Sequence, residues 1–249
     1  MHASHSSWIE NLTWSQVEQR IDAGAIAILP VGAASKEHGR HLPMNTDYRQ
    51  AEWLASQLAS RLDVLIWPII NYGYYPSFVD YPGSISIAEE TFRSTIEAVI
   101  TGICFSGVSR VLILNTGIST IRPLQQAVEN VGASADVYLH NVYSGRVFSR
   151  TEQSLSEQQF GGHADEIETS IMLALDESVV DLNLASSQPV KISKGLFNRT
   201  EPDQLNFSPD GINGDATLAS REKGEKLLAA LLTDCLEAMS KRFALASAD

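Results

Sequence analysis

Apolar residues along this chain alternate between short continuous runs and longer stretches with helical spacing. The continuous runs at 25–31, 64–70, 111–114 and 137–142 have the length of buried strands. Helical spacing separates these runs, which is typical of parallel strands joined by crossover helices. The pattern therefore predicts an α/β fold, a three-layer αβα sandwich around a mostly parallel sheet.

Local signals predict where individual helices lie. Thr13 and Gln16 have the spacing of a capping box, so a first helix is expected to start there. Apolar periodicity predicts further helices over 89–106 and 163–175. Asp215 is placed to cap a long last helix.

Two long stretches, 145–162 and 188–213, show no clear periodicity and are expected to be irregular. Loops of that length in a compact domain usually carry function or shape an interface. The chain contains no internal repeat and no linker that would divide it. We therefore expect residues 1–249 to form one domain, with residues 1–7 disordered.

Charge and composition restrict the partners. The formal net charge is −12, and such a surface repels nucleic acid and anionic membranes, so neither is expected as a partner. No apolar run approaches the ~20 residues needed to cross a bilayer, and the polar start of the chain lacks a signal-peptide core. Cys104 and Cys235 lie in apolar helical patterns, which favours reduced thiols. A cytoplasmic protein with a small-molecule substrate is the simplest interpretation.

The polar segment after the first predicted strand concentrates residues that bind metals. It contains Lys36, Glu37, His38, His41 and Asp47, and thus two of the six histidines of the chain within four residues. Imidazole and carboxylate groups together bind zinc, manganese or iron. The alternative is a solvated loop in which the aspartate caps the next helix.

A small polar turn, Asn115–Thr116–Gly117 and the three residues that follow, comes after the third predicted strand. Backbone N–H groups at such a turn can hold an anion or an oxyanion. An ordinary turn that caps a helix explains the same residues equally well.

A third cluster surrounds the predicted start of the helix at 163–175. A histidine at this end of a helix tends to stay neutral, which suits His163 as a base or a ligand. Glu168 follows more than one helical turn later. Asp165 and Glu166 are expected to form a solvated first turn of that helix.

Four segments, taken in order, resemble the creatininase, or creatinine amidohydrolase, family. Its first signature is approximately L-P-x-G-S-x-E-x-H-G-P-H-L-P-x-x-T-D, and three later ones are Y-G-x-S…F-P-G-T-x-S, H-A-G-x-x-E-T-S and G-x-x-G-D-P. The matching segments of this chain are 29–32 with 38–47, 72–86, 162–170 and 211–216. The resemblance extends over about residues 8–235.

The resemblance implies a creatininase-like fold that often assembles as hexamers, and hence a homo-oligomer. It also implies a metal-dependent hydrolase in which metal-activated water attacks a cyclic amide or a related C–N bond. Carried over by motif, His38 and Asp47 are metal ligands, with Asp47 the candidate bridge between two metals, zinc or manganese. Glu168 is a ligand or contacts the substrate, and His163 is the acid/base that protonates the leaving nitrogen.

Two departures from the family pattern affect the same metal. The ligand glutamate position holds Lys36, and Glu37 beside it can be a ligand only if a bulge re-aims its side chain, because neighbours on extended backbone point to opposite faces. The family histidine after the third strand is Gly117, which has no side chain to offer. We therefore expect fewer divalent cations than the family's pair, one or none, and the Lys36 ammonium could occupy the vacated place.

The same departures support an alternative, a non-hydrolytic or catalytically impaired member of the family. Lys36, His41 and the turn formed by Asn115, Thr116 and Gly117 would then hold a small anionic ligand. A third possibility is a structural subunit of a hexamer that keeps a vestigial pocket.

Overall fold

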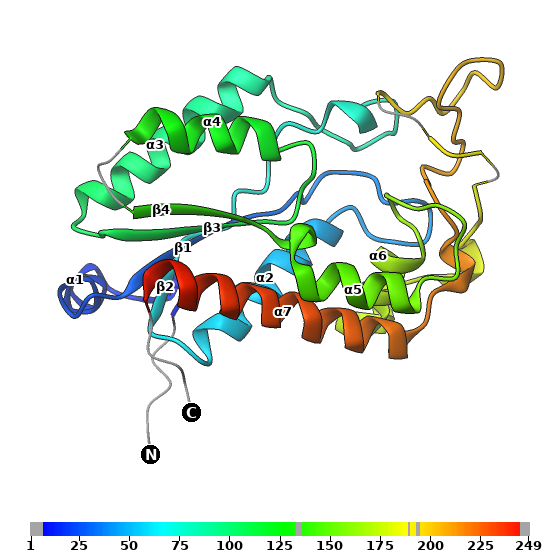
Figure 1. The fold of residues 1–249 in the computed structure, drawn as a ribbon. Helices are drawn as coiled ribbons and strands as arrows, with labels where there is room; N and C mark the ends of the chain where they lie inside the picture. Colours follow the sequence, from blue (N-terminus) through cyan, green and yellow to red (C-terminus); the bar gives the residue numbers. More distant parts are fainter. Residues whose placement is uncertain (1–6, 133–135, 189, 193–194, 245–249) are drawn as a thin grey trace.

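The computed structural model describes residues 7–132, 136–188, 190–192 and 195–244 (Figure 1). Residues 1–6, for which disorder was expected, lie outside this range. Ser7, the last residue of that segment, is described, and its carbonyl oxygen accepts a hydrogen bond from the Ile66 backbone N–H at 2.7 Å.

Four parallel strands form one sheet in the order β2-β1-β3-β4, which confirms the predicted α/β class. In β1, Ala27 lies opposite Leu65 of β2 and Val111 of β3. The helices and strands are α1 (Trp14–Asp22), β1 (Ile26–Val31), α2 (Thr46–Ala59), β2 (Val64–Ile66), α3 (Glu89–Phe105), β3 (Arg110–Asn115), α4 (Ile121–Val131), β4 (Asp136–Asn141), α5 (Arg146–Leu155), α6 (Glu166–Asp176) and α7 (Arg221–Phe243).

Both faces of the sheet are covered, because successive strand residues point to opposite sides. Ile26 and Ile28 of β1 pack into a cluster with α2, α6 and α7. Ala27, Leu29 and Val31 pack into a second cluster with α3 and α4. Figure 1 shows α3 and α4 on one side of the strands and α2, α5, α6 and α7 on the other, so the three layers are as predicted.

The structure differs from the predicted elements at several points. β2 ends at Ile66 rather than residue 70, and only an isolated bridge joins Ile70 to Val31. Asp215 caps the 3-10 turn Ala216–Leu218, whereas Ser220 caps α7. The predicted capping box at the start of α1 is confirmed.

The stretch 145–162 was expected to be irregular, but it contains α5. The side chain that caps this helix comes from α7, where Asp234 accepts hydrogen bonds from the backbone N–H groups of Val147 at 3.0 Å and Phe148 at 2.7 Å. The cap is more than 80 residues away in the chain. Local sequence therefore carried no sign of it.

Close packing of α7 against α6 sets the position of one wall of the site. Gly224 of α7 faces the backbone of α6, and a Cβ atom there would lie 1.8 Å from the carbonyl oxygen of Ser170. Only a residue without a side chain permits this approach. Among the described residues, no helix is both long and apolar enough to cross a membrane.

Candidate metal and catalytic site

The candidate site lies at the carboxyl ends of β1 and β3. Val31 and Asn115, the last residues of these strands, pair directly, so the loop that follows each strand starts at the same edge of the sheet. Gly32 lets the first loop pass close to α2, since a Cβ there would lie 2.5 Å from the carbonyl oxygen of Asp47. The start of α6 completes the site.

A buried ion pair occupies the centre. Nζ of Lys36 lies 2.7 Å from Oδ2 of Asp47, and the two residues are 6% and 0% exposed. Burial lowers the pKa of Lys36, but Asp47, Glu168 and Glu37 together outweigh it and the pKa is raised. Burial likewise raises the pKa of Asp47, but Lys36 and then His38 outweigh it and hold that pKa well below its usual range. Both groups are therefore charged.

Glu37 points away from this ion pair. Its carboxylate accepts hydrogen bonds from the Gly39 backbone N–H at 2.9 Å and from Nε2 of His163 at 2.8 Å, and it fills the space beside Gly211. Lys36 and His38, on either side, both reach Asp47. The side chains thus alternate as on extended backbone, and the chain makes no bulge that aims Glu37 at the metal-ligand position.

His38 has a tautomer fixed by its neighbours. Its Nδ1 lies 2.9 Å from the carbonyl oxygen of Lys36, which only accepts hydrogen bonds, so Nδ1 carries the proton. Its Nε2 lies 3.2 Å from Oδ1 of Asp47 and 3.8 Å from Oε1 of Glu168. An imidazole nitrogen and two carboxylate oxygens are atoms that can bind a cation.

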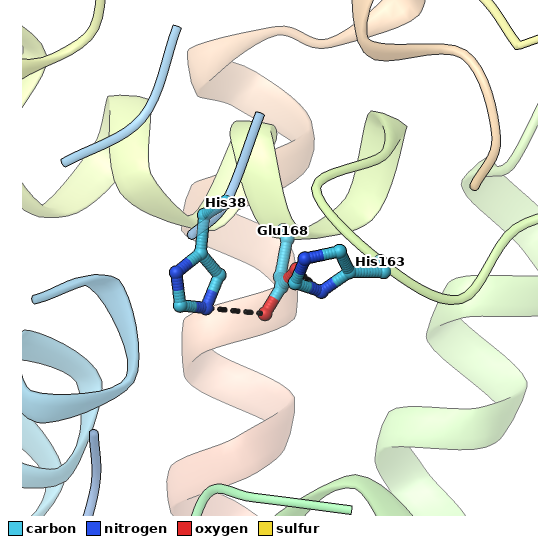
Figure 2. Close-up of side chains that lie close together, drawn as sticks. All are labelled: His38, His163 and Glu168. Atoms are coloured by element: carbon cyan, nitrogen blue, oxygen red, sulfur yellow. Dashed lines mark ion pairs between the residues drawn. The ribbon is translucent and has the colours of Figure 1, made fainter. Parts of the chain in front are cut away.

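Glu168 lies between two imidazole rings, those of His38 and His163 (Figure 2). One possible ligand atom from each of these three residues lies within 4.8 Å of the others. Oε2 of Glu168 accepts a hydrogen bond from the Ala164 backbone N–H at 2.6 Å, which fixes the carboxylate. Histidine and carboxylate ligands at this spacing fit a divalent cation such as zinc or manganese.

His163 precedes α6 rather than opening it. Its Nε2 lies 2.8 Å from Oε1 of Glu37 and 3.1 Å from the Glu37 carbonyl oxygen, so Nε2 carries a proton. Its Nδ1 lies 3.7 Å from Oε2 of Glu168. Burial lowers the pKa of His163, but Glu37 and then Glu168 outweigh it and the pKa is raised. The two carboxylates thus act against the effect of the helix end, which was the only influence that the sequence indicated.

The expectation of a solvated first turn at Asp165 and Glu166 is also wrong. Asp165 is 5% exposed and caps α6 by accepting hydrogen bonds from the backbone N–H groups of Ile167 and Glu168. Glu166 is 0% exposed and pairs with Lys223 of α7 at 2.6 Å. Both carboxylates hold α6 in place.

The turn after β3 uses its polar groups internally. The Asn115 side chain donates to the Gly117 carbonyl oxygen and accepts from the Gly117 N–H and the Thr120 hydroxyl. The Thr116 hydroxyl donates to the carbonyl oxygens of Val31 and Asp47. These bonds fix the turn against β1 and α2. The predicted role of the turn in substrate binding stays a prediction.

His41 lies behind the site. It is 2% exposed, and its Nε2 lies 2.8 Å from the hydroxyl of Thr169. Burial lowers the pKa of His41 to about 4, so the ring is neutral near pH 7. Its predicted contact with substrate also stays a prediction.

A cavity of about 250 Å³ opens onto the ion pair and the His163 imidazole. Sequence reasoning missed the residues of its apolar wall, which include Tyr75, Phe78, Tyr143 and Phe148. The signal available for two of them was the aromatic loop at 72–86. Phe148 lies in α5, within the stretch 145–162 that was expected to be irregular, and Tyr143 lies in the 3-10 turn that precedes it.

Comparison with known proteins assigns the family. The family profile described as creatinine amidohydrolase matches residues 10–239. The chain belongs to the creatininase family. Creatinine amidohydrolase of Pseudomonas putida is 28% identical over 96% of this chain and 98% of its own length. The 3-dehydro-scyllo-inosose hydrolase of Thermotoga maritima is 26% identical over 92% of this chain and 81% of its own length.

Solved creatininase structures share the fold. A mutant creatininase described as the Zn-Zn type superposes with a TM-score of 0.85 and 25% sequence identity, covering 97% of this chain and all of its own. The predicted resemblance and the creatininase-like fold are therefore confirmed. The named relatives are hydrolases with different substrates, so membership supports a metal-dependent hydrolase and leaves the substrate open.

Proposed function

We propose that this protein is a hydrolase of amide-type C–N bonds that uses one divalent cation, zinc or manganese. The observation that carries the proposal is the position of His38 Nε2, which lies 3.2 Å from Oδ1 of Asp47 and 3.8 Å from Oε1 of Glu168, beside the His163 imidazole. A cation held there would lower the pKa of a bound water to near neutral. It would also polarise the carbonyl group of the substrate. All other steps fall to the side chains around it.

Lys36 takes the place of a second cation in this proposal. Its ammonium neutralises Asp47 from inside the site and lies over the rings of Phe78 at 5.1 Å and Tyr75 at 5.7 Å. A carboxylate that is paired in this way cannot bridge two metals through the same oxygen. The ammonium also faces the cavity, where a fixed positive charge stabilises an oxygen that becomes negative in the transition state.

His163 is the proton donor in this proposal. Glu37 fixes the ring through Nε2, which leaves Nδ1 directed towards Glu168 and the cavity. A nitrogen that leaves a tetrahedral carbon must gain a proton, and an oriented imidazolium supplies one. We assign Glu37 to the orientation of this ring, in place of the ligand role that the spacing suggested.

Turnover and its dependence on metal test the proposal together. Purified protein is stripped with a chelator, reloaded with zinc or manganese, and assayed for hydrolysis of creatinine, formamides and simple primary and cyclic amides. The proposal predicts hydrolysis of at least one C–N bond only in the reloaded protein. Absence of hydrolysis under every metal supplement contradicts it.

The Lys36–Asp47 ion pair favours a second candidate, a non-hydrolytic protein that binds a small anion through the ammonium. That function predicts thermal stabilisation by small carboxylates that does not depend on metal. Stabilisation that a chelator abolishes rules it out.

We also propose a homo-oligomer, a hexamer by resemblance to the family, in the cytoplasm. Large apolar side chains exposed on the single chain support an interface, among them Phe105 at 94% and Leu205 at 85% exposure. The proposed location rests on Cys104 and Cys235, which lie in the helices α3 and α7, positions that favour reduced thiols. Sedimentation of the purified protein measures the number of subunits.

A further inference from the structure

The cavity at the site is lined by four carboxylic acids and two cationic side chains. Four acids line it, namely Asp47, Glu152, Asp165 and Glu168, together with Lys36 and the His163 imidazole. Three of the four acids have an assigned partner. Asp47 pairs with Lys36, Glu168 lies between the two imidazoles, and Asp165 caps α6.

Glu152 is the acid that remains. It lies on α5 and is half-buried, yet no described residue forms a hydrogen bond or an ion pair with its carboxylate. Burial and the nearby charge of Asp165 raise its pKa, which means that the ionised carboxylate is unfavourable in the cavity as it stands. A positive group brought in by a ligand would relieve this unfavourable state.

The position of Glu152 indicates where the positive group of a ligand would lie. The residue lines both the cavity at the site and a second cavity of about 300 Å³, whose wall is polar and includes Ser149, Gln153 and Gln158. Gly162 is the other residue that the two cavities share. A substrate that reaches Glu152 from the site therefore extends past the reacting centre towards a polar opening.

Apolar side chains line the same cavity. Phe78, Tyr143, Phe148 and Ile167 contribute to its wall, so methylene groups or a ring fit there. The cavity therefore combines a cation and a proton donor, an apolar wall, and an unpaired carboxylate where the two cavities meet.

We propose that the site selects amides that carry a protonated amine, held by Glu152, separated from the scissile C–N bond by an apolar segment. This inference rests on the proposed hydrolytic function, which it deepens by naming the substrate class. A charge-assisted hydrogen bond in a partly buried cavity gives a preference of about 10- to 100-fold over an uncharged isostere.

A matched pair of primary amides tests this. The amides are 6-aminohexanamide and heptanamide, which differ by an ammonium in place of a methyl group. Their binding to metal-loaded protein is measured by calorimetry, and their turnover is measured as ammonia release. The expected result is that the amine binds at least about 10-fold more tightly than heptanamide. In Glu152→Gln this preference is expected to fall to within about 2-fold.

The control separates contact from overall charge. In Glu152→Gln combined with Gln153→Glu, the net charge is restored, but the carboxylate moves to a neighbouring residue that lines only the second cavity. Loss of the preference in both variants, with unchanged melting temperatures, supports the contact. A preference that the double variant restores, or that is absent from the unaltered protein, overturns the inference. If the preference is present but neither these amides nor the wider panel of C–N substrates is hydrolysed, the amine contact stands and the hydrolytic function fails.

Discussion

The ammonium of Lys36 lies 2.7 Å from Oδ2 of Asp47, at the centre of the site and away from solvent. The carboxylate that we propose as a metal ligand thus already has a cation of the chain's own as its partner. His38 and Glu168 lie beside this pair, and in our proposal they hold one further cation. The ion pair is our explanation for the divergence of this chain from the metal signature of its family.

This ion pair makes a prediction about stability. Replacing Lys36 by Met leaves the Asp47 carboxylate buried without a counter-ion, which costs about 3–5 kcal/mol of unfolding free energy. Adding Asp47→Asn removes the stranded charge and restores much of that loss. Urea unfolding of the metal-free single and double variants measures both effects. Equal loss in the two variants would mean that packing, not charge, sets the cost.

Orientation of His163 by Glu37 makes a prediction about rate. Glu37→Gln removes the charge that holds the imidazolium, so kcat falls by about 10- to 100-fold while KM changes little. Because Glu37 helps to raise the pKa of His163, the limb of the pH–rate profile at high pH moves to lower pH. If kcat falls but the high-pH limb of the pH–rate profile does not move, the role of Glu37 is purely structural.

His41 predicts how stability depends on pH. Its pKa is about 4 in the folded protein and about 6.5 in the unfolded chain, so the unfolded state binds the extra proton between these values. The contribution of the neutral ring is complete above pH 6.5 and is lost as the pH falls towards 4, by about 3 kcal/mol in total. His41→Gln keeps a polar group beside Thr169 without this titration. The difference in unfolding free energy between the two proteins, measured from pH 8 to pH 4.5, should therefore shrink as the pH falls; a constant difference contradicts the assignment.

Gly224 predicts a packing defect that has an internal control. An added Cβ at Gly224 meets the backbone of Ser170, so Gly224→Ala displaces α6 and destabilises the protein by about 1–3 kcal/mol or more. At Gly102, in the exposed part of α3, an added Cβ meets nothing within 4 Å. Gly102→Ala is therefore expected to stabilise the protein by about 0.5–1 kcal/mol. Thermal unfolding of both variants compares the two sites; equal effects would refute the close approach of the helices.

The sequence predicted the sheet because β1 and β3 are short, continuously apolar runs, and only such runs can be buried on both faces. It also predicted that Lys36 and Glu37 point in opposite directions, since extended backbone forces that alternation. The contacts of Glu37 with Gly39 and His163, on the side away from Asp47, agree with this alternation. These features depend on neighbouring residues, so local reasoning reached them.

The features that the sequence did not predict depend on distant residues. The cap of α5 comes from Asp234, and the burial of Glu166 depends on Lys223. Because α5 was not expected, neither was the cavity wall at Phe148, nor the unpaired carboxylate of Glu152. The raised pKa of His163 likewise depends on Glu37, which reaches it only in the folded chain.

The number of divalent ions per chain tests the central claim, one bound cation beside a lysine that replaces the other. Protein purified without chelator and reloaded with zinc is analysed for metal content, next to His38→Ala and Lys36→Glu. The account predicts one ion in the unaltered protein, none in His38→Ala, and a second ion in Lys36→Glu, where a carboxylate replaces the ammonium. Two ions in the unaltered protein, or hydrolysis that persists with none, would contradict it.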